Sequence, residues 1–140
     1  MKDKFFLDTN IFVYSFDTRE PAKAKVAGQL IEDGIATRKG TVSYQVVQEF
    51  FNVALSKFRK PMTVAECEQY LRVIFRPLLV VHPSETLLSD ALYLRERAGL
   101  SWYDSLIVGA AQQSDCKVLF TEDMQHGQVF DELRIVNPFR

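Results

Sequence analysis

The chain of 140 residues alternates between short apolar runs and longer stretches in which apolar residues recur every three or four positions. Short apolar runs are typical of buried β-strands, and the longer spacing is typical of amphipathic helices. The pattern predicts strands at residues 5–7, 41–43, 78–81, 118–120 and 134–136. It predicts helices at residues 11–16, 21–34, 46–60, 63–75, 83–98 and 101–111.

Residues that start and stop helices support several of these bounds. Pro21 suits the first turn of a helix, and Gly34 is expected to be the C-terminal stop of the same helix. Thr63 and Glu66 have the spacing of a capping box. Residues 78–81 are continuously apolar, which predicts a strand covered on both faces.

The alternation of strands and helices predicts the α/β fold class. We expect a three-layer α/β/α sandwich with a four- to five-stranded, mainly parallel sheet, formed by residues 1–140 as a single domain. In such a sheet the functional crevice lies at the carboxyl ends of the strands.

Composition and charge narrow the function. The net charge of −1 is not the basic balance of a protein that holds nucleic acid by charge alone, so local patches or metal ions would have to bind phosphates. Cys67 and Cys116 form no CxxC pair and are expected to be buried, reduced thiols. No signal peptide or membrane-spanning run is evident, so we expect a cytoplasmic protein without membrane contact.

Two acids follow predicted strands. Asp8 ends the first strand, and Asp123 lies just past the fourth. Both are therefore expected at the edge of the sheet where a site would form. Taken singly, each also fits an Asx turn or a helix cap, which are common roles for Asp after a strand.

Two further acids lie on apolar helix faces. Glu49 shares its face with Val46 and Val53, and Asp104 shares its face with apolar residues of the last predicted helix. A carboxylate in such a place is costly unless it is paired or bound to a metal. Glu49 reaching into water, and Asp104 acting in a capping box with Ser101, remain open alternatives.

Together the four acids indicate a metal site. Carboxylates forced together raise one another's pKa, and a divalent cation removes that penalty. Oxygen ligands without a nearby Cys/His set favour Mg²⁺ or Mn²⁺ over zinc. Such an ion activates water and stabilises the charge of an attack on phosphorus. The expected catalytic residues and metal ligands are Asp8, Glu49, Asp104 and Asp123.

Four motifs, in order, resemble those of PIN-domain nucleases. They are Phe6-Leu7-Asp8-Thr9-Asn10, the lone Glu49 within an apolar helix, residues 100–108 around Asp104, and Leu119-Phe120-Thr121-Glu122-Asp123. The motifs cover nearly the whole chain. The compact size and the third motif look most like VapC-type toxins of toxin–antitoxin pairs.

The resemblance implies a Mg²⁺- or Mn²⁺-dependent endoribonuclease that cleaves RNA, forms a homodimer and is inhibited by a small antitoxin. It makes the four acids metal ligands and gives supporting hydrogen-bonding roles to Thr9, Asn10 and Thr121. Glu122 is an additional acid beside Asp123, and which of the two faces the metal stays open.

Other interpretations are weaker. A haloacid-dehalogenase phosphatase wants a second Asp where this chain has Asn10, and a response-regulator receiver wants an acidic neighbour where it has Thr9. The main alternative is a PIN-fold RNA-binding or regulatory module outside a toxin pair, with weak or no nuclease activity. The aromatic pair Trp102-Tyr103 could stack RNA bases, although packing at a helix start or a dimer contact is the simpler role.

Overall fold

The structure is a computed structural model that describes residues 3–140. Its strands are β1 (Phe5–Leu7), β2 (Gly40–Ser43), β3 (Leu79–Val81), β4 (Val118–Phe120), β5 (Val129–Phe130) and β6 (Leu133–Val136). Its α-helices are α1 (Thr9–Tyr14), α2 (Pro21–Thr37), α3 (Tyr44–Ser56), α4 (Val64–Tyr70), α5 (Glu85–Ala98) and α6 (Trp102–Gln113). A π-helical turn, η1 (Leu71–Phe75), continues α4.

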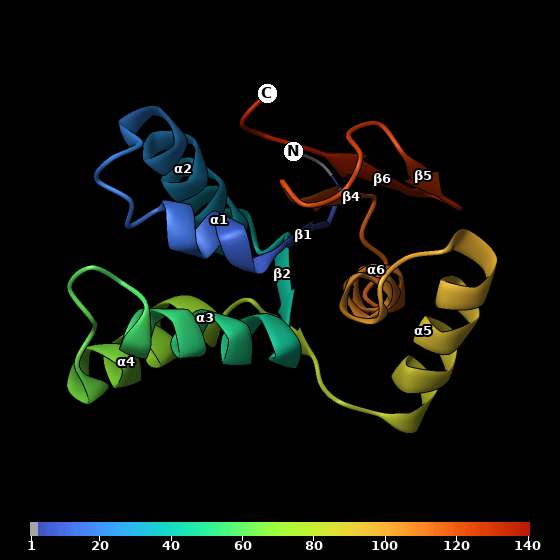
Figure 1. Ribbon diagram of the computed structural model, residues 1–140, viewed down its shortest axis with the longest axis horizontal. Helices are drawn as coiled ribbons and strands as arrows, with labels where there is room; N and C mark the ends of the chain where they lie inside the picture. The colour runs from blue at the N-terminus through green and yellow to red at the C-terminus, as the bar shows by residue number, and fades with distance from the viewer. Residues whose placement is uncertain (1–2) are drawn as a thin grey trace.

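The strands form one sheet in the order β3-β2-β1-β4-β6-β5. All neighbouring pairs are parallel except β5 with β6. Helices α1 to α4 lie on one side of the sheet, and α5 and α6 lie on the other (Figure 1). The prediction of a three-layer, mainly parallel α/β fold is confirmed, with six strands rather than four or five.

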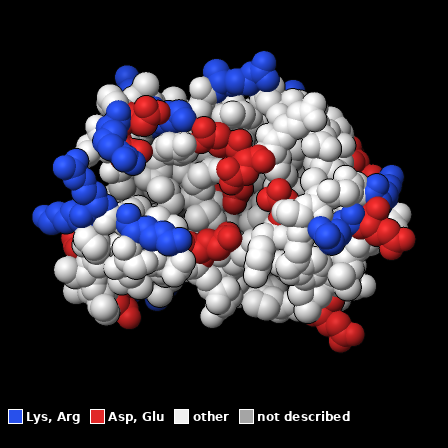
Figure 2. Space-filling view, viewed as in Figure 1, with Lys and Arg blue, Asp and Glu red and all other residues white. Residues whose placement is uncertain are grey.

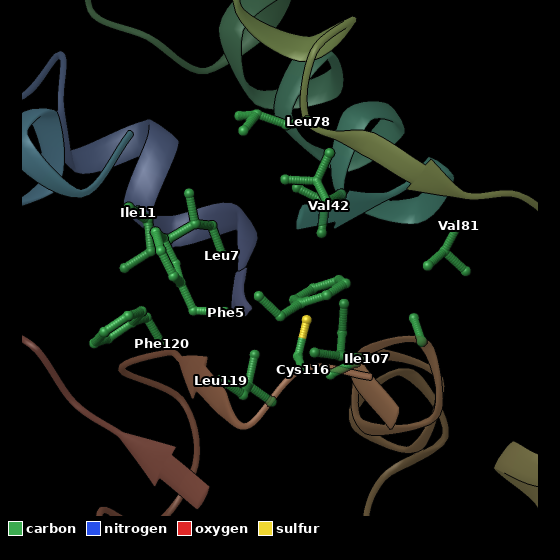
Figure 3. Close-up of a cluster of buried hydrophobic side chains, with 14 of the residues drawn as sticks. Phe5, Leu7, Ile11, Val42, Leu78, Val81, Ile107, Cys116, Leu119 and Phe120 are labelled. Carbon is green, nitrogen blue, oxygen red and sulfur yellow. The ribbon is translucent and has the colours of Figure 1, made fainter. Parts of the chain in front are cut away.

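The core is built around β1, whose three residues are all buried. The cluster of buried apolar residues extends over both faces of the sheet and includes Phe5 and Leu7 of β1, Val42 of β2, Leu119 of β4 and Ile107 of α6 (Figure 3). Removing this much apolar surface from water is the main favourable contribution to folding. It also places the carboxyl end of β1 at the centre of the sheet edge.

Helix α2 runs three residues past Gly34, so the prediction that Gly34 ends it is wrong. Arg38, with φ 61°, ends the helix instead. Gly34 lies against Gly40 of β2, where a Cβ on Gly34 would come within 3.1 Å of the Gly40 Cα. The glycine therefore permits close packing of helix on strand rather than a left-handed turn.

The predictions for two edge strands also differ from the structure. Strand β3 has a sheet neighbour on one side only, and Val80 is 54% exposed, so the strand is not covered on both faces. Strand β5 has two residues, which is too short to give a hydrophobic period, and it was not predicted. The expected capping box of α4 is present, with reciprocal bonds between Thr63 and Glu66.

Cys67 and Cys116 are buried free thiols, as expected. Within residues 3–140, no helix is both long and apolar enough to cross a membrane.

The contact between Gly34 and Gly40 generates a stability prediction. A Cβ on Gly40 would lie 2.6 Å from the Gly34 Cα, so Gly40→Ala must push α2 away from β2. We expect a loss of about 1–3 kcal/mol in the free energy of unfolding, measured by urea denaturation. Gly28→Ala, in α2, is the control, because nothing lies within 4 Å of a Cβ at this position. That control should gain about 0.5–1 kcal/mol, and equal effects of the two substitutions would contradict the packing argument.

Candidate active site

The Asp8 carboxylate lies at the carboxyl end of β1 and is the most buried acid of the site, at 5% exposure. Its Oδ1 accepts from the Thr9 backbone N–H at 2.7 Å, and its Oδ2 accepts from the Thr121 hydroxyl at 2.7 Å. Burial nevertheless outweighs these bonds and raises the pKa of Asp8 to about 6, with smaller contributions from Asp123 and Glu49. The hydrogen bonds to the Asp8 carboxylate therefore do not fully replace the hydration that the anion loses on burial.

Two threonines connect Asp8 to its neighbours. The Thr9 hydroxyl donates to Glu49 Oε1 at 3.0 Å, so one residue contacts both Asp8 and Glu49. Thr121 is fully buried, and its hydroxyl oxygen also accepts from the Asp123 backbone N–H at 3.1 Å. These bonds join the ends of β1 and β4 and the middle of α3.

Asp104 and Asp123 complete the group nearer to solvent. Asp123 is exposed and Asp104 is partly buried in the first turn of α6. Partial burial raises the pKa of Asp123, and the nearby Asp104 carboxylate raises it further. The Ser101 hydroxyl caps α6 by accepting from the Asp104 backbone N–H.

Glu122 and Asp123 are adjacent in sequence but differ in environment. Glu122 Oε1 accepts from Lys23 Nζ at 3.0 Å, and the Tyr14 hydroxyl and the Lys23 ammonium lower the pKa of Glu122. Asp123 is instead electrostatically coupled to Asp8 and Asp104. Asp123, not Glu122, is therefore the acid coupled to Asp8.

Asn10 is unusual because both polar atoms of its amide are buried and, among the residues described, neither has a hydrogen-bond partner of good geometry. The amide lies beside Asp123 and lowers the pKa of that carboxyl. A buried amide left unpaired costs free energy unless water or a ligand satisfies it.

Acidic side chains gather near the centre of the face shown in Figure 2, between the α1–α4 side and the α5–α6 side. Within residues 3–140, no three acidic, His or Cys side chains converge tightly enough to enclose a metal ion. The donor set still fits a hydrated ion, because Mg²⁺ keeps several waters and takes only one or two carboxylates directly. The buried Asp8 carboxylate and the orphaned Asn10 amide are polar groups that such an ion and its waters would satisfy.

Sequence reasoning missed two residues at the site. Gln45 Nε2 lies 3.5 Å from Glu49 Oε1, and the four-residue spacing on one helix was a usable signal. Lys23 pairs with Glu122 across 99 positions of sequence, which no local pattern reveals. The Nδ1 of His126, a residue of the loop after Asp123, accepts from the Asn137 backbone N–H at 3.0 Å.

A family model described as the PIN domain matches residues 5–131. A toxin–antitoxin complex from Klebsiella pneumoniae has a similar fold, with 20% identity, coverage of 96% of this chain and 98% of that chain, and a TM-score of 0.70. No curated protein sequence gives a significant match.

Two further solved structures are similar. The structure of FitAB bound to an IR36 DNA fragment is 16% identical, covers 97% of this chain and 96% of that chain, and has a TM-score of 0.73. VapBC2 from Rickettsia felis, bound to a promoter DNA fragment, is 20% identical, covers 94% and 96%, and has a TM-score of 0.60. At these identities the likeness shows a shared fold.

The raised pKa of Asp8 predicts a specific pH dependence in the metal-free protein. The pKa is about 6 in the folded state against 3.8 ordinarily, so the folded state favours protonated Asp8. Its contribution to stability is present below about pH 4 and is lost as the pH rises through 6. Asp8→Asn removes this loss, so its stability advantage over the wild type should widen by about 3 kcal/mol between these limits.

The measurement is urea denaturation in EDTA from about pH 4 to about pH 7. Asp33→Asn, on the exposed face of α2, removes the same charge away from the site and is the control. A stability gap between Asp8→Asn and the wild type that does not change with pH would refute the proposed cost of the buried carboxylate.

Proposed function

Because the chain belongs to the PIN domain family, whose members are in general nucleases, we propose that it is a Mg²⁺- or Mn²⁺-dependent endoribonuclease. The observation that carries the proposal is the buried Asp8 carboxylate, raised in pKa and coupled to Glu49 and Asp123 at the carboxyl edge of a parallel sheet. An Asp that only caps a helix does not require a buried carboxylate beside other acids.

The residues proposed to hold the metal are Asp8, Glu49, Asp104 and Asp123. PIN nucleases in general use divalent metal ions. When bound, the ion would polarise a water and offset charge on the phosphate. A carboxylate set of this kind suits that chemistry because hard oxygen ligands prefer Mg²⁺ and Mn²⁺.

Hydrogen bonds within the chain orient the proposed metal ligands. Thr121 and the Thr9 N–H fix both oxygens of Asp8, and the Thr9 hydroxyl fixes Glu49. Asp8 forms the floor of the site, whereas Asp123 is exposed at its rim. The RNA phosphate is therefore proposed to approach from the rim. The buried amide of Asn10 is proposed to hydrogen-bond a water held inside the site.

The proposed biological role is that of a VapC-type toxin with a small antitoxin partner and a homodimeric assembly. The Klebsiella pneumoniae structure is a toxin–antitoxin complex and the Rickettsia felis structure is VapBC2, and both share the fold of this chain over nearly its full length. The alternative is a PIN-fold RNA-binding or regulatory module outside a toxin pair, with weak or no nuclease activity.

Cleavage of RNA tests the enzymatic proposal. Total cellular RNA is incubated with purified protein in EDTA, Mg²⁺ or Mn²⁺, and the cleavage ends are sequenced. We expect discrete cuts that require metal and fall at least about 100-fold in Asp8→Asn and Asp104→Asn, because metal-dependent water activation is lost. The exposed Asp33→Asn variant should cut like the wild type. Full activity in EDTA, or in both site variants, would exclude the mechanism.

Growth on expression tests the toxin proposal separately. Induction of the wild-type chain in a host without an antitoxin should arrest growth, because RNA would be cut without restraint. Asp8→Asn, expressed to an equal level, should leave growth normal. Normal growth with a wild-type protein that is active in vitro would exclude the toxin role and leave a ribonuclease outside a toxin pair.

A further inference from the structure

A hollow of about 450 Å³ lies between the start of α3, the loop that leads from β3 into α5, and the start of α6. Its lining includes Tyr44, Gln45, His82, Leu88 and Tyr103. Ser43 ends β2 and Tyr44 follows it, and His82 follows β3, so the hollow occupies the same carboxyl edge of the sheet as Asp8. It is a separate site on that edge.

Gln45 connects the hollow to the acids. Its side-chain Nε2 lies 3.5 Å from Glu49 Oε1 and 3.5 Å from the Tyr103 carbonyl oxygen. Both distances are at the outer limit of hydrogen bonding, so the amide is held loosely and can turn towards a ligand. Tyr103 itself directly precedes Asp104. A chain molecule whose phosphate meets the acids would thus pass next to the hollow.

The lining chemistry selects the kind of group that fits. The hollow is bordered by no Lys, Arg, Asp or Glu, so it offers neither charge for a phosphate nor a counter-ion for a charged peptide side chain. It offers an apolar wall, which includes Leu88 and Leu106, together with aromatic rings and side-chain amides. Rings of this kind stack on bases, and amides hydrogen-bond base edges. Tyr103 is 63% exposed and Tyr44 is 44% exposed, so both rings are accessible.

We propose that this hollow is a base-binding subsite that takes one unstacked base of single-stranded RNA next to the phosphate that is cut. The proposal rests on the endoribonuclease function proposed above and adds its substrate class. Tyr103 supplies the stacking face, and Gln45 supplies the amide that reads the base edge. Duplex RNA would be a poor substrate, because its bases are already stacked and paired.

Binding without metal tests the subsite independently of catalysis. The probe is a 12-nucleotide single-stranded RNA with 2-aminopurine at one position, moved along the strand and mixed with the full chain in EDTA. Stacking quenches the fluorescence of this base. We expect quenching at a restricted set of positions for the wild type, and about tenfold weaker binding with the quench lost for Tyr103→Ala.

Two variants control for bulk and folding. Tyr103→Phe keeps the ring and should keep the quench. Tyr93→Ala removes a tyrosine of similar exposure, 61%, that lies on α5 outside the lining, and it should bind like the wild type. Thermal denaturation of all three checks that each variant folds.

The outcomes separate the two proposals. Wild-type cleavage with unchanged binding, quenching and base preference in Tyr103→Ala would overturn the subsite and leave the nuclease standing. A quench that depends on Tyr103, without cleavage in any metal, would support the subsite and overturn the nuclease. If Tyr103→Ala converts a dimer into monomers in light scattering while its RNA affinity is unchanged, the hollow is an interface between copies, and the subsite is wrong.

Discussion

The buried carboxylate of Asp8 is the constraint on which the site depends. Strand β1 is buried along its length between β2 and β4, so the residue that follows it emerges at the centre of the sheet edge. An anion in that place loses much of its hydration. Hydrogen bonds from one backbone N–H and one hydroxyl replace only part of the lost hydration. The pKa of Asp8 therefore stays raised, at about 6. The fold thus retains an affinity for a proton or a cation at this point.

The two threonines make this group of acids act as a unit. Thr121 bonds to Asp8 and to the Asp123 backbone, and Thr9 bonds to Asp8 and to Glu49. Buried polar networks of this kind are rigid when complete and costly when broken. Glu122 stands outside the network because Lys23 compensates its charge. Glu122 and Asp123 are therefore adjacent in sequence but differ in role: Glu122 forms an ion pair, and Asp123 lies at the site.

The parts of the fold that could be predicted from sequence are those set by local chemistry. The apolar run before Asp8 placed β1, and the spacing of Thr63 and Glu66 placed the start of α4. The parts that could not be predicted depend on distant partners. The sequence alone suggests that Gly34 ends a helix, because it does not show that Gly34 packs against Gly40. The separation of Glu122 from Asp123 likewise depends on Lys23, which sequence spacing does not connect to either.

Aromatic packing explains how so short a helix can hold part of the site. Helix α1 has six residues, too few to be stable alone, so its position must come from tertiary contacts. Phe12 packs against Phe50 and Phe75, with ring centroids 6.3 Å and 4.9 Å away, and Phe50 stacks on Tyr70 at 5.0 Å. Phe50 directly follows Glu49 in α3. The same apolar contacts that hold α1 against α3 therefore set the hydrogen bond between Thr9 and Glu49, and burial of rings on one side of the helices positions charge on the other.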